Sequence, residues 1–192
     1  MANSRPKAIL LVDGYNIVGA WSVLKQTCDR EGMEPARRQL TEALVNYSAY
    51  QGYDTRIVFD AQYQDTPGSS EVVTQHVSIH YTDFGQTADT FIEKFCALFR
   101  NDARKFEQRL IVATSDRAQQ LTVVGYGAEC LSAQRLSLDM DLAIQKVHRA
   151  KSPAKRSRNR FLGNTLDPSA QQLLTKLRFG VENDRPSNQK NL

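Results

Sequence analysis

The sequence predicts a three-layer α/β domain with a mainly parallel central sheet, followed by a basic segment and a C-terminal helix. Short apolar runs alternate with helical patterns from residue 7 to residue 150, as in sheets whose strands are joined by covering helices. Several runs are apolar throughout, which is typical of strands buried on both faces. The length of 192 residues, 41% of them hydrophobic, suits one such domain and a tail. We therefore expect a domain over residues 7–150 and the basic segment and helix over residues 151–192.

The first half of the domain is predicted to hold two buried strands and a helix between them. The strands are residues 8–12 (AILLV) and 56–61 (RIVFDA), and the helix is residues 34–51. Pro35 suits the first turn of this helix, and Gly52 can end it. The apolar residues that share one helix face are Ala36, Leu40, Ala43, Leu44 and Tyr47.

The second half continues the alternation. A polar loop is expected over residues 62–70, and residues 73–81 alternate as one strand with a solvated face. A helix follows from residue 87 to about residue 104. Residues 111–114 form another buried strand, and Ser115 is expected to cap the next helix.

The last predicted elements are shorter. Residues 129–131 are expected to form a short strand, and Ser132 to start a long helix. Residues 151–165, rich in Lys, Arg, Ser and Asn, read as a mobile segment. A final helix over residues 167–178 is expected to pack its leucine stripe on the domain.

Three aspartates occur where strands end or helices begin. Asp13 follows ILLV, Asp116 follows IVATS, and Asp89 opens an amphipathic helix. The carboxyl ends of parallel strands form the ligand-binding edge of such a sheet, and carboxylates gathered there repel one another unless a cation joins them. Oxygen ligands without a His or Cys cluster favour Mg²⁺ or Mn²⁺ over zinc. The sequence therefore predicts a divalent metal site formed by Asp13, Asp89 and Asp116.

Each aspartate taken alone is better explained as a helix cap or turn former, and it is the occurrence of three such sites in one small domain that favours a common ligand. Ser115 is expected to take the capping role beside Asp116, and Thr87 has a similar place beside Asp89. This would leave both carboxylates free for a ligand. Asp60 also ends a strand, but we rank it below the other three.

Two more residues extend the predicted site. Glu93 lies four residues after Asp89 on the same helix face, so the two carboxylates either repel or serve a common cation. Asn16 follows Asp13 by three residues and can orient a metal-bound water or a phosphate. A turn residue after Gly14 explains Asn16 nearly as well.

Several other chemistries are excluded by the residues. The first strand leads into DGYN, which lacks the GxGxxG of a dinucleotide site. Tyr15 stands where an aspartyl-phosphate phosphatase needs a second aspartate, and Ser115 lacks the glycines of a nucleophile elbow. His76 and His80, four residues apart on one strand, would lie about 13 Å from each other, too far to share an ion.

The C-terminal segment concentrates positive charge. Six of the lysines and arginines lie between residues 149 and 160 without an acid among them, so the rest of this +4 chain sums to −2. A basic segment beside a mildly acidic body suits contact with a polyanion, although a solvated linker has the same composition. The residues that we expect to bind RNA are Lys155, Arg156, Arg158 and Arg160.

The chain is expected to be cytoplasmic. Its three cysteines are widely spaced and odd in number, as in buried thiols of a reducing compartment. No apolar run approaches the roughly 18 residues of a membrane span. The start of the chain has no signal-peptide cleavage region.

Five ordered motifs resemble the YacP-type NYN domain family, which is similar to the PIN-like ribonucleases. The motifs are DGYNIVGAW (13–21), VFDA (58–61), TADTFIEK (87–94), ATSD (113–116) and GAECLSAQRL (127–136). The resemblance covers about residues 7–150 and implies a PIN-like three-layer fold with metal-dependent endoribonuclease activity. It also matches Asp13, Asn16, Asp89 and Asp116 to the acidic centre of the family, and Glu93 to a further acidic position.

The expected activity is hydrolysis of RNA phosphodiester bonds by a water that Mg²⁺ or Mn²⁺ activates, with mRNA or ribosome-associated RNA as the substrate. Glu93 would hold a water or act as a base, and Asn16 would position water or a phosphate oxygen. The alternative is an RNA-binding or ribosome-associated module without efficient catalysis, which would retain RNA without cutting it. A DNA 5′-nuclease ranks third because long insertions for a threading arch are missing. The choice of RNA over DNA depends on the resemblance.

Overall fold

The computed structural model describes residues 6–60 and 68–151. The chain divides into two compact units, Met1–Arg149 and Ala150–Leu192, of which the first contains the sheet. The basic residues 155–160, the helix expected over residues 167–178 and most of the loop expected over residues 62–70 lie outside the described residues. Within the described part, no helix combines the length and the apolar character that a membrane crossing requires.

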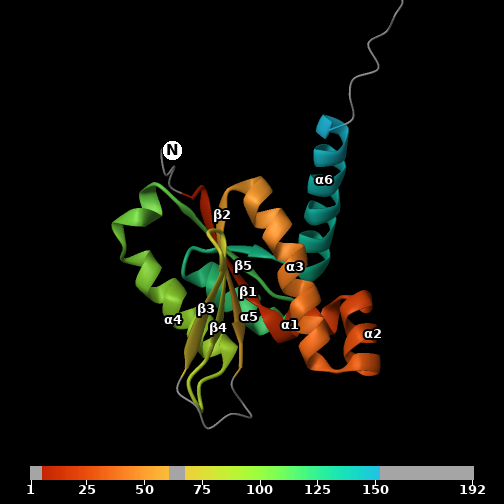
Figure 1. Cartoon of the computed structure of the whole chain (residues 1–192). Helices are drawn as coiled ribbons and strands as arrows, with labels where there is room; N and C mark the ends of the chain where they lie inside the picture. Colours follow the sequence, from red (N-terminus) through yellow and green to blue (C-terminus); the bar gives the residue numbers. More distant parts are fainter. Residues whose placement is uncertain (1–5, 61–67, 152–192) are drawn as a thin grey trace, which may run out of the picture. The chain divides into compact units, whose positions relative to one another are not determined.

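A six-stranded sheet in the order β3-β4-β2-β1-β5-β6 forms the centre of this unit (Figure 1). All the strand pairs in it are parallel except β3 with β4. Every residue of β1 is buried, as a continuous apolar run in a central parallel strand requires. The strands are β1 (Ala8–Asp13), β2 (Tyr53–Phe59), β3 (Ser69–Thr74), β4 (Val77–Tyr81), β5 (Arg109–Ala113) and β6 (Glu129–Leu131).

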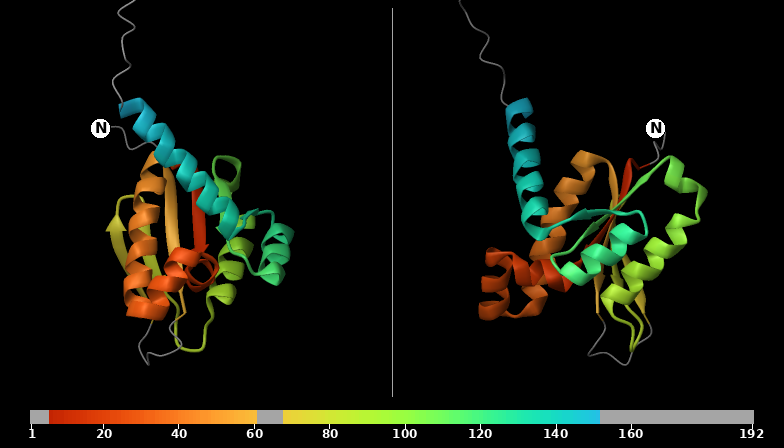
Figure 2. Two further views of the ribbon diagram at one scale, coloured as in Figure 1. Left: turned by 90° about the vertical axis from the view of Figure 1, so that its right-hand side faces the viewer. Right: turned by 180° about the vertical axis from the view of Figure 1, so that it is seen from behind.

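Helices cover both faces of the sheet (Figures 1 and 2). Buried residues of α1, α2, α3 and α6 form one core with one face of the sheet, and those of α4 and α5 form a second core with the other. The predicted three-layer α/β fold with a mainly parallel sheet is therefore confirmed. The helices are α1 (Gly14–Ala20), α2 (Ser22–Glu31), α3 (Met33–Gln51), α4 (Ala88–Arg100), α5 (Arg117–Gly125) and α6 (Ala133–Lys151), with a short 3₁₀ helix, η1 (Ala103–Phe106).

The predicted boundaries of α3 are accurate to within one residue. Ala36, Leu40 and Leu44 are completely buried along one face of this helix. Gly52 ends the helix in the left-handed conformation, at φ 71°, where a residue with a side chain would be strained. Helix α4 also begins at the predicted place, but it ends at Arg100, and η1 follows.

Residues 69–81 form an antiparallel hairpin, so the prediction of a loop and then one strand was wrong there. Gln75 and His76 make the turn between β3 and β4. His76 therefore does not lie on one strand with His80, which belongs to β4. Neither turn residue is a glycine or proline, and the alternation of apolar residues runs through the turn, so the pattern concealed the break.

Helices α1 and α2 were not predicted. The chain turns into α1 directly after β1, and Asp13 caps this helix by accepting a hydrogen bond from the backbone of Asn16. Ser22 begins α2 immediately after Trp21, whose ring nitrogen donates to the carbonyl of Ala133 at 2.8 Å. This bond connects the α1–α2 corner to the first residue of α6.

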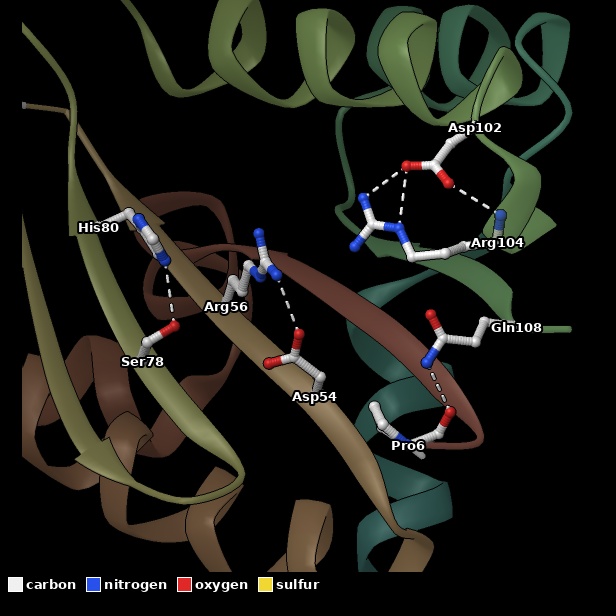
Figure 3. A network of polar contacts seen from close by, with 8 residues as sticks. All are labelled: Pro6, Asp54, Arg56, Ser78, His80, Asp102, Arg104 and Gln108. Atoms are coloured by element: carbon white, nitrogen blue, oxygen red, sulfur yellow. Dashed lines mark hydrogen bonds and ion pairs between the residues drawn. The ribbon is translucent and has the colours of Figure 1, made fainter. Parts of the chain in front are cut away.

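Two ion pairs, one within β2 and one before β5, each join residues two positions apart in the chain (Figure 3). Arg56 bonds Asp54 at 3.0 Å within β2. Before β5, Arg104 bonds Asp102 at 2.6 Å.

Candidate active site

Three aspartates lie at the carboxyl ends of the three central strands. Asp13 is the last residue of β1, Asp60 follows β2, and Asp116 follows β5 by three residues. Strand β1 lies between β2 and β5. The chain leaves β1 for β2 on one side of β1, and after β4 it crosses to β5 on the other side. Ligands of open α/β sheets bind where the strand order reverses in this way.

Asp13 and Asp60 each use one carboxyl oxygen to cap a helix. Asp13 Oδ1 accepts from the backbone N–H of Asn16 at 3.2 Å, at the start of α1. Asp60 Oδ1 accepts from the backbone N–H of Ala88, the first residue of α4. The partial positive charge of a helix N-terminus favours a carboxylate in each place.

Asp116 is the N-cap of α5, which corrects the prediction that Ser115 has this role. Asp116 Oδ1 accepts from the backbone N–H of Ala118 at 2.7 Å and of Gln119 at 3.1 Å. The hydroxyl of Ser115 instead accepts from the backbone N–H of Ala133, at the start of α6. Serine and aspartate both cap helices well, so residue type does not decide which of the two caps α5. Because the hydroxyl of Ser115 is bonded to the start of α6, Asp116 takes the capping role. The cap occupies Oδ1 of Asp116 and leaves Oδ2 for another partner.

Asp89 reaches the same edge from the second position of α4. Thr87 caps α4, as predicted, by accepting from the backbone N–H of Thr90. Asp89 Oδ1 instead accepts from the side-chain nitrogen of Gln119. Gln119 is only 3% exposed, and its Oε1 is buried without a hydrogen-bond partner among the described residues. An unpaired buried acceptor is unfavourable unless a ligand or water completes it.

Burial and neighbouring carboxylates raise the pKa of two acids at this edge, Asp13 and Asp89. Burial raises the pKa of Asp13 to about 6, and the charges of Asp89, Asp60 and Asp116 add to the rise. Burial also raises the pKa of Asp89, followed by the charges of Asp116, Asp60 and Glu93. None of the ion pairs formed between described residues includes these five acids. The edge is therefore a concentration of negative charge without a basic partner in the described part of the chain.

Asn16 bridges two of the strand ends. Its Oδ1 accepts from the backbone N–H of Ser115 at 2.6 Å and so joins α1 to the loop after β5. Because this bond fixes the amide, Nδ2 is the end of the side chain that can donate to a ligand.

The residues at this edge fit a divalent cation in charge and in donor type. The donors are carboxylate oxygens, with the unpaired amide oxygen of Gln119 beside Asp89, and such oxygens are the usual ligands of Mg²⁺ and Mn²⁺. In their positions here, however, no group of three or more acidic, His or Cys side chains within residues 6–60 and 68–151 is arranged tightly enough to hold an ion. Binding would require the side chains to draw closer together.

The structure places two further residues, Asp60 and Gln119, beside the predicted site residues. Asp60 has the same strand-end position as Asp13, so consistent use of that signal would have included it. Gln119 had no comparable signal, because its contact with Asp89 joins two helices that are separated by 30 positions in the chain.

A family model, a relative and two solved structures point to the same family. The family model of the YacP-like NYN domain matches residues 10–179. YacP of Bacillus subtilis (strain 168) is 35% identical over 142 residues, which are 73% of this chain and 79% of that protein. The crystal structure of Rae1 (YacP) from Bacillus subtilis has a TM-score of 0.59 at 29% identity, covering 90% of this chain and 95% of that one. A point mutant of Rae1 has a TM-score of 0.61 at 29% identity, with 88% and 99% covered.

Proposed function

Because this chain belongs to the family of YacP-like NYN domains, we propose that it is a metal-dependent endoribonuclease. NYN domains are generally nucleases and belong to the PIN-like superfamily, whose members generally use divalent metals. The predicted family and fold class are thereby confirmed. The observation that carries the proposal is Asp13, whose pKa is raised to about 6 by burial and then by three further carboxylates. Acids that are held together despite burial and mutual repulsion are typical of functional sites.

Asp13, Asp89 and Asp116 would hold the ion. When bound, Mg²⁺ or Mn²⁺ would lower the pKa of water and offset the negative charge of the phosphodiester. Asn16 Nδ2 would donate to a phosphate oxygen or to the attacking water. Glu93 would accept the proton of that water at its carboxylate, one helical turn from Asp89.

The proposed activity should depend on pH through Asp13. Its pKa is about 6 in the folded protein without metal, and a carboxylate binds a cation only when deprotonated. Metal affinity and cleavage should therefore rise as the pH increases through about 6. Mn²⁺ titrations of binding and of cleavage at pH 5 and pH 7.5 would measure this dependence.

Circular RNA provides the sharpest test, because only an internal cut opens a circle. The purified chain should linearise circular RNA in Mg²⁺ or Mn²⁺ and lose this activity in EDTA. Asp89→Asn should lower the rate by roughly 100-fold or more. The matched control is Asp102→Asn, at the amino edge, where the carboxylate pairs with Arg104; this variant should cleave normally. Equal rates for the two variants would exclude the proposed site.

An RNA-binding module without efficient catalysis is the second candidate. The observation in its favour is that the described acids are not grouped tightly enough for an ion. Such a module would bind the circle without opening it at any concentration of Mg²⁺ or Mn²⁺. The binding and linearisation assays together therefore separate the two functions.

A further inference from the structure

Arg37 lies among aromatic rings at the same edge of the sheet as the acids. Its guanidinium carbon is 5.7 Å from the ring centres of both Phe59 and Tyr81, and Nη1 is 3.5 Å from the hydroxyl of Tyr15. Phe59 and Tyr81 are the last residues of β2 and β4. Tyr15 follows Asp13 by two residues. The group therefore adjoins the acidic edge on the side of the sheet that α3 covers.

The three rings pack against one another in a row, with Phe59 between the two tyrosines. The ring centres of Tyr15 and Phe59 are 5.1 Å apart, and those of Phe59 and Tyr81 are 6.0 Å apart with the planes nearly parallel. Phe59 is completely buried, whereas Tyr15 and Tyr81 are half-buried. The two tyrosines are thus partly accessible to solvent beside the guanidinium.

The bonding of Arg37 is incomplete for a half-buried arginine. Its Nε is buried and has no hydrogen-bond partner among the described residues. Nη2 pairs with Glu34, but the side chain of Glu34 is 72% exposed. Ion pairs with such an exposed partner are weak and easily exchanged. A guanidinium whose Nη2 has only a loosely held partner is suited to receive a phosphate in exchange for that partner.

We propose that Arg37, Tyr15 and Tyr81 form a nucleotide-binding subsite of the nuclease. The guanidinium binds a backbone phosphate in exchange for Glu34, and a neighbouring base stacks on the exposed tyrosine surface. This combination of an arginine with aromatic rings is general in proteins that bind single strands. The inference rests on the proposed function, since the subsite would place a single RNA strand next to the acids that cut it.

A purely structural role for Arg37 predicts different results. In that case Glu34 is its natural partner, and loss of either residue lowers stability without a specific effect on RNA. If the subsite exists, Glu34 competes with the phosphate, so substitutions of Arg37 and Glu34 change RNA affinity in opposite directions. If Arg37→Ala proves unstable, the gain in affinity expected for the substitution of Glu34 alone still tests the subsite.

The first experiment compares Arg37→Ala with Arg38→Ala, which removes the same charge from the next, exposed position of α3. Binding of a fluorescent single-stranded RNA is measured by anisotropy in EDTA over a salt series, and cleavage is measured with Mn²⁺. Arg37→Ala should weaken binding about tenfold and reduce the slope of log K against log salt by about 0.7. In cleavage, KM should rise while kcat changes little. Arg38→Ala should resemble the wild type in all these measurements.

The second experiment compares Glu34→Gln with Glu42→Gln, which removes one exposed negative charge elsewhere on α3. Glu34→Gln should strengthen RNA binding by more than Glu42→Gln does. The subsite is excluded if Arg37→Ala and Arg38→Ala have the same affinity and KM, or if the two glutamine variants are equal. A wild type that neither binds nor cuts RNA contradicts the nuclease function itself, and the subsite with it. A wild type that cuts RNA while the paired variants do not differ contradicts the subsite alone.

Discussion

Asp13 is a carboxylate whose position reduces stability. Its pKa is about 6 in the folded chain, against an ordinary value of 3.8. Because the folded state binds this proton more tightly than the unfolded state, the free energy of unfolding decreases as the pH rises from 3.8 through about 6. A difference of about two pKa units corresponds to about 3 kcal/mol. Below pH 3.8 the side chain is protonated in both the folded and the unfolded state, so it no longer lowers the free energy of unfolding.

Replacing Asp13 by Asn should therefore stabilise the metal-free protein at high pH. Asparagine caps helices as well as aspartate does, so the cap of α1 is retained while the buried charge is removed. At pH 8 in EDTA, we expect the free energy of unfolding to increase by up to about 3 kcal/mol. At pH 3.5 we expect no gain. Urea denaturation at the two pH values would measure both.

Asp102→Asn is the control for this prediction. The side-chain bond from Arg104 is the largest influence on Asp102 and lowers its pKa, so the sign of its pH dependence is opposite to that of Asp13. Removing this charge should give no gain in stability at pH 8. A gain for Asp13→Asn that is equal at both pH values would show that the buried charge is not its cause.

At the level of single residues, strand-end positions were predictable and side-chain partners were not. The apolar runs before Asp13 and Asp116 located both residues at one edge of the sheet. Whether Ser115 or Asp116 caps α5 depends on the start of α6, which takes the hydroxyl of Ser115. That contact joins parts of the chain whose packing no local pattern encodes.

At the level of elements, the start of α1 determines where Asp13 and Tyr15 lie. Gly14 is buried as the first residue of α1, and a Cβ at this position would overlap the ring of Phe59. Because Gly14 has no side chain, the ring can pack directly against the backbone of α1. Gly14 is thus required by packing, and the same contact aligns the acidic edge with the aromatic group.

Gly14→Ala should consequently destabilise the protein although alanine favours helices. Overpacking of a core typically costs about 1–3 kcal/mol, which exceeds the gain of up to about 1 kcal/mol from helix propensity. Displacement of α1 should also reduce cleavage. Gly19→Ala is the matched control in the same helix, because a Cβ there meets nothing within 4 Å. It should leave stability unchanged or raise it, and equal melting temperatures for the two variants would contradict the packing explanation.

Elements with a long apolar periodicity were predicted well, and short elements were not. Helix α3 buries an apolar face along 19 residues, whereas α1 has 7 residues and lies within a segment that also reads as a turn. The β3–β4 hairpin escaped prediction because its turn, at Gln75 and His76, lacks the usual turn residues. In both cases tertiary packing, rather than local preference, determines the structure.

At the level of the whole molecule, strand topology and charge distribution together suggest a path for RNA. The strand order reverses at β1, which brings acids from β1, β2, α4 and α5 to one edge. The positive charge of the chain is concentrated in residues 149–160, and the rest sums to −2. We propose that residues 7–150 form the nuclease domain and residues 151–192 an RNA-binding extension. The family match continues through residue 179, so it includes this basic segment.

The basic segment should set RNA affinity without affecting the chemical step. Six charges can neutralise at most six phosphates, and each contributes about 0.7 to the slope of log K against log salt for a single strand, so the total can reach about 4. Replacing Lys155, Arg156, Arg158 and Arg160 by alanine should weaken binding and reduce this slope by up to about 3. Turnover at saturating RNA should change little, because the acids at the edge of the sheet are untouched.

The control for this variant must remove the same charge from another surface. Lys25, Arg30, Arg100 and Arg135 are exposed on the helices of the domain, and replacing these four by alanine lowers the net charge equally. If the basic segment contacts phosphates directly, only its own variant should lose salt dependence, because counterion release follows contacts rather than overall charge. Equal slopes for the two variants would mean that the segment contributes only its overall charge. The RNA would then have to follow the domain surface, where Arg37 offers a partly buried guanidinium beside the acidic edge.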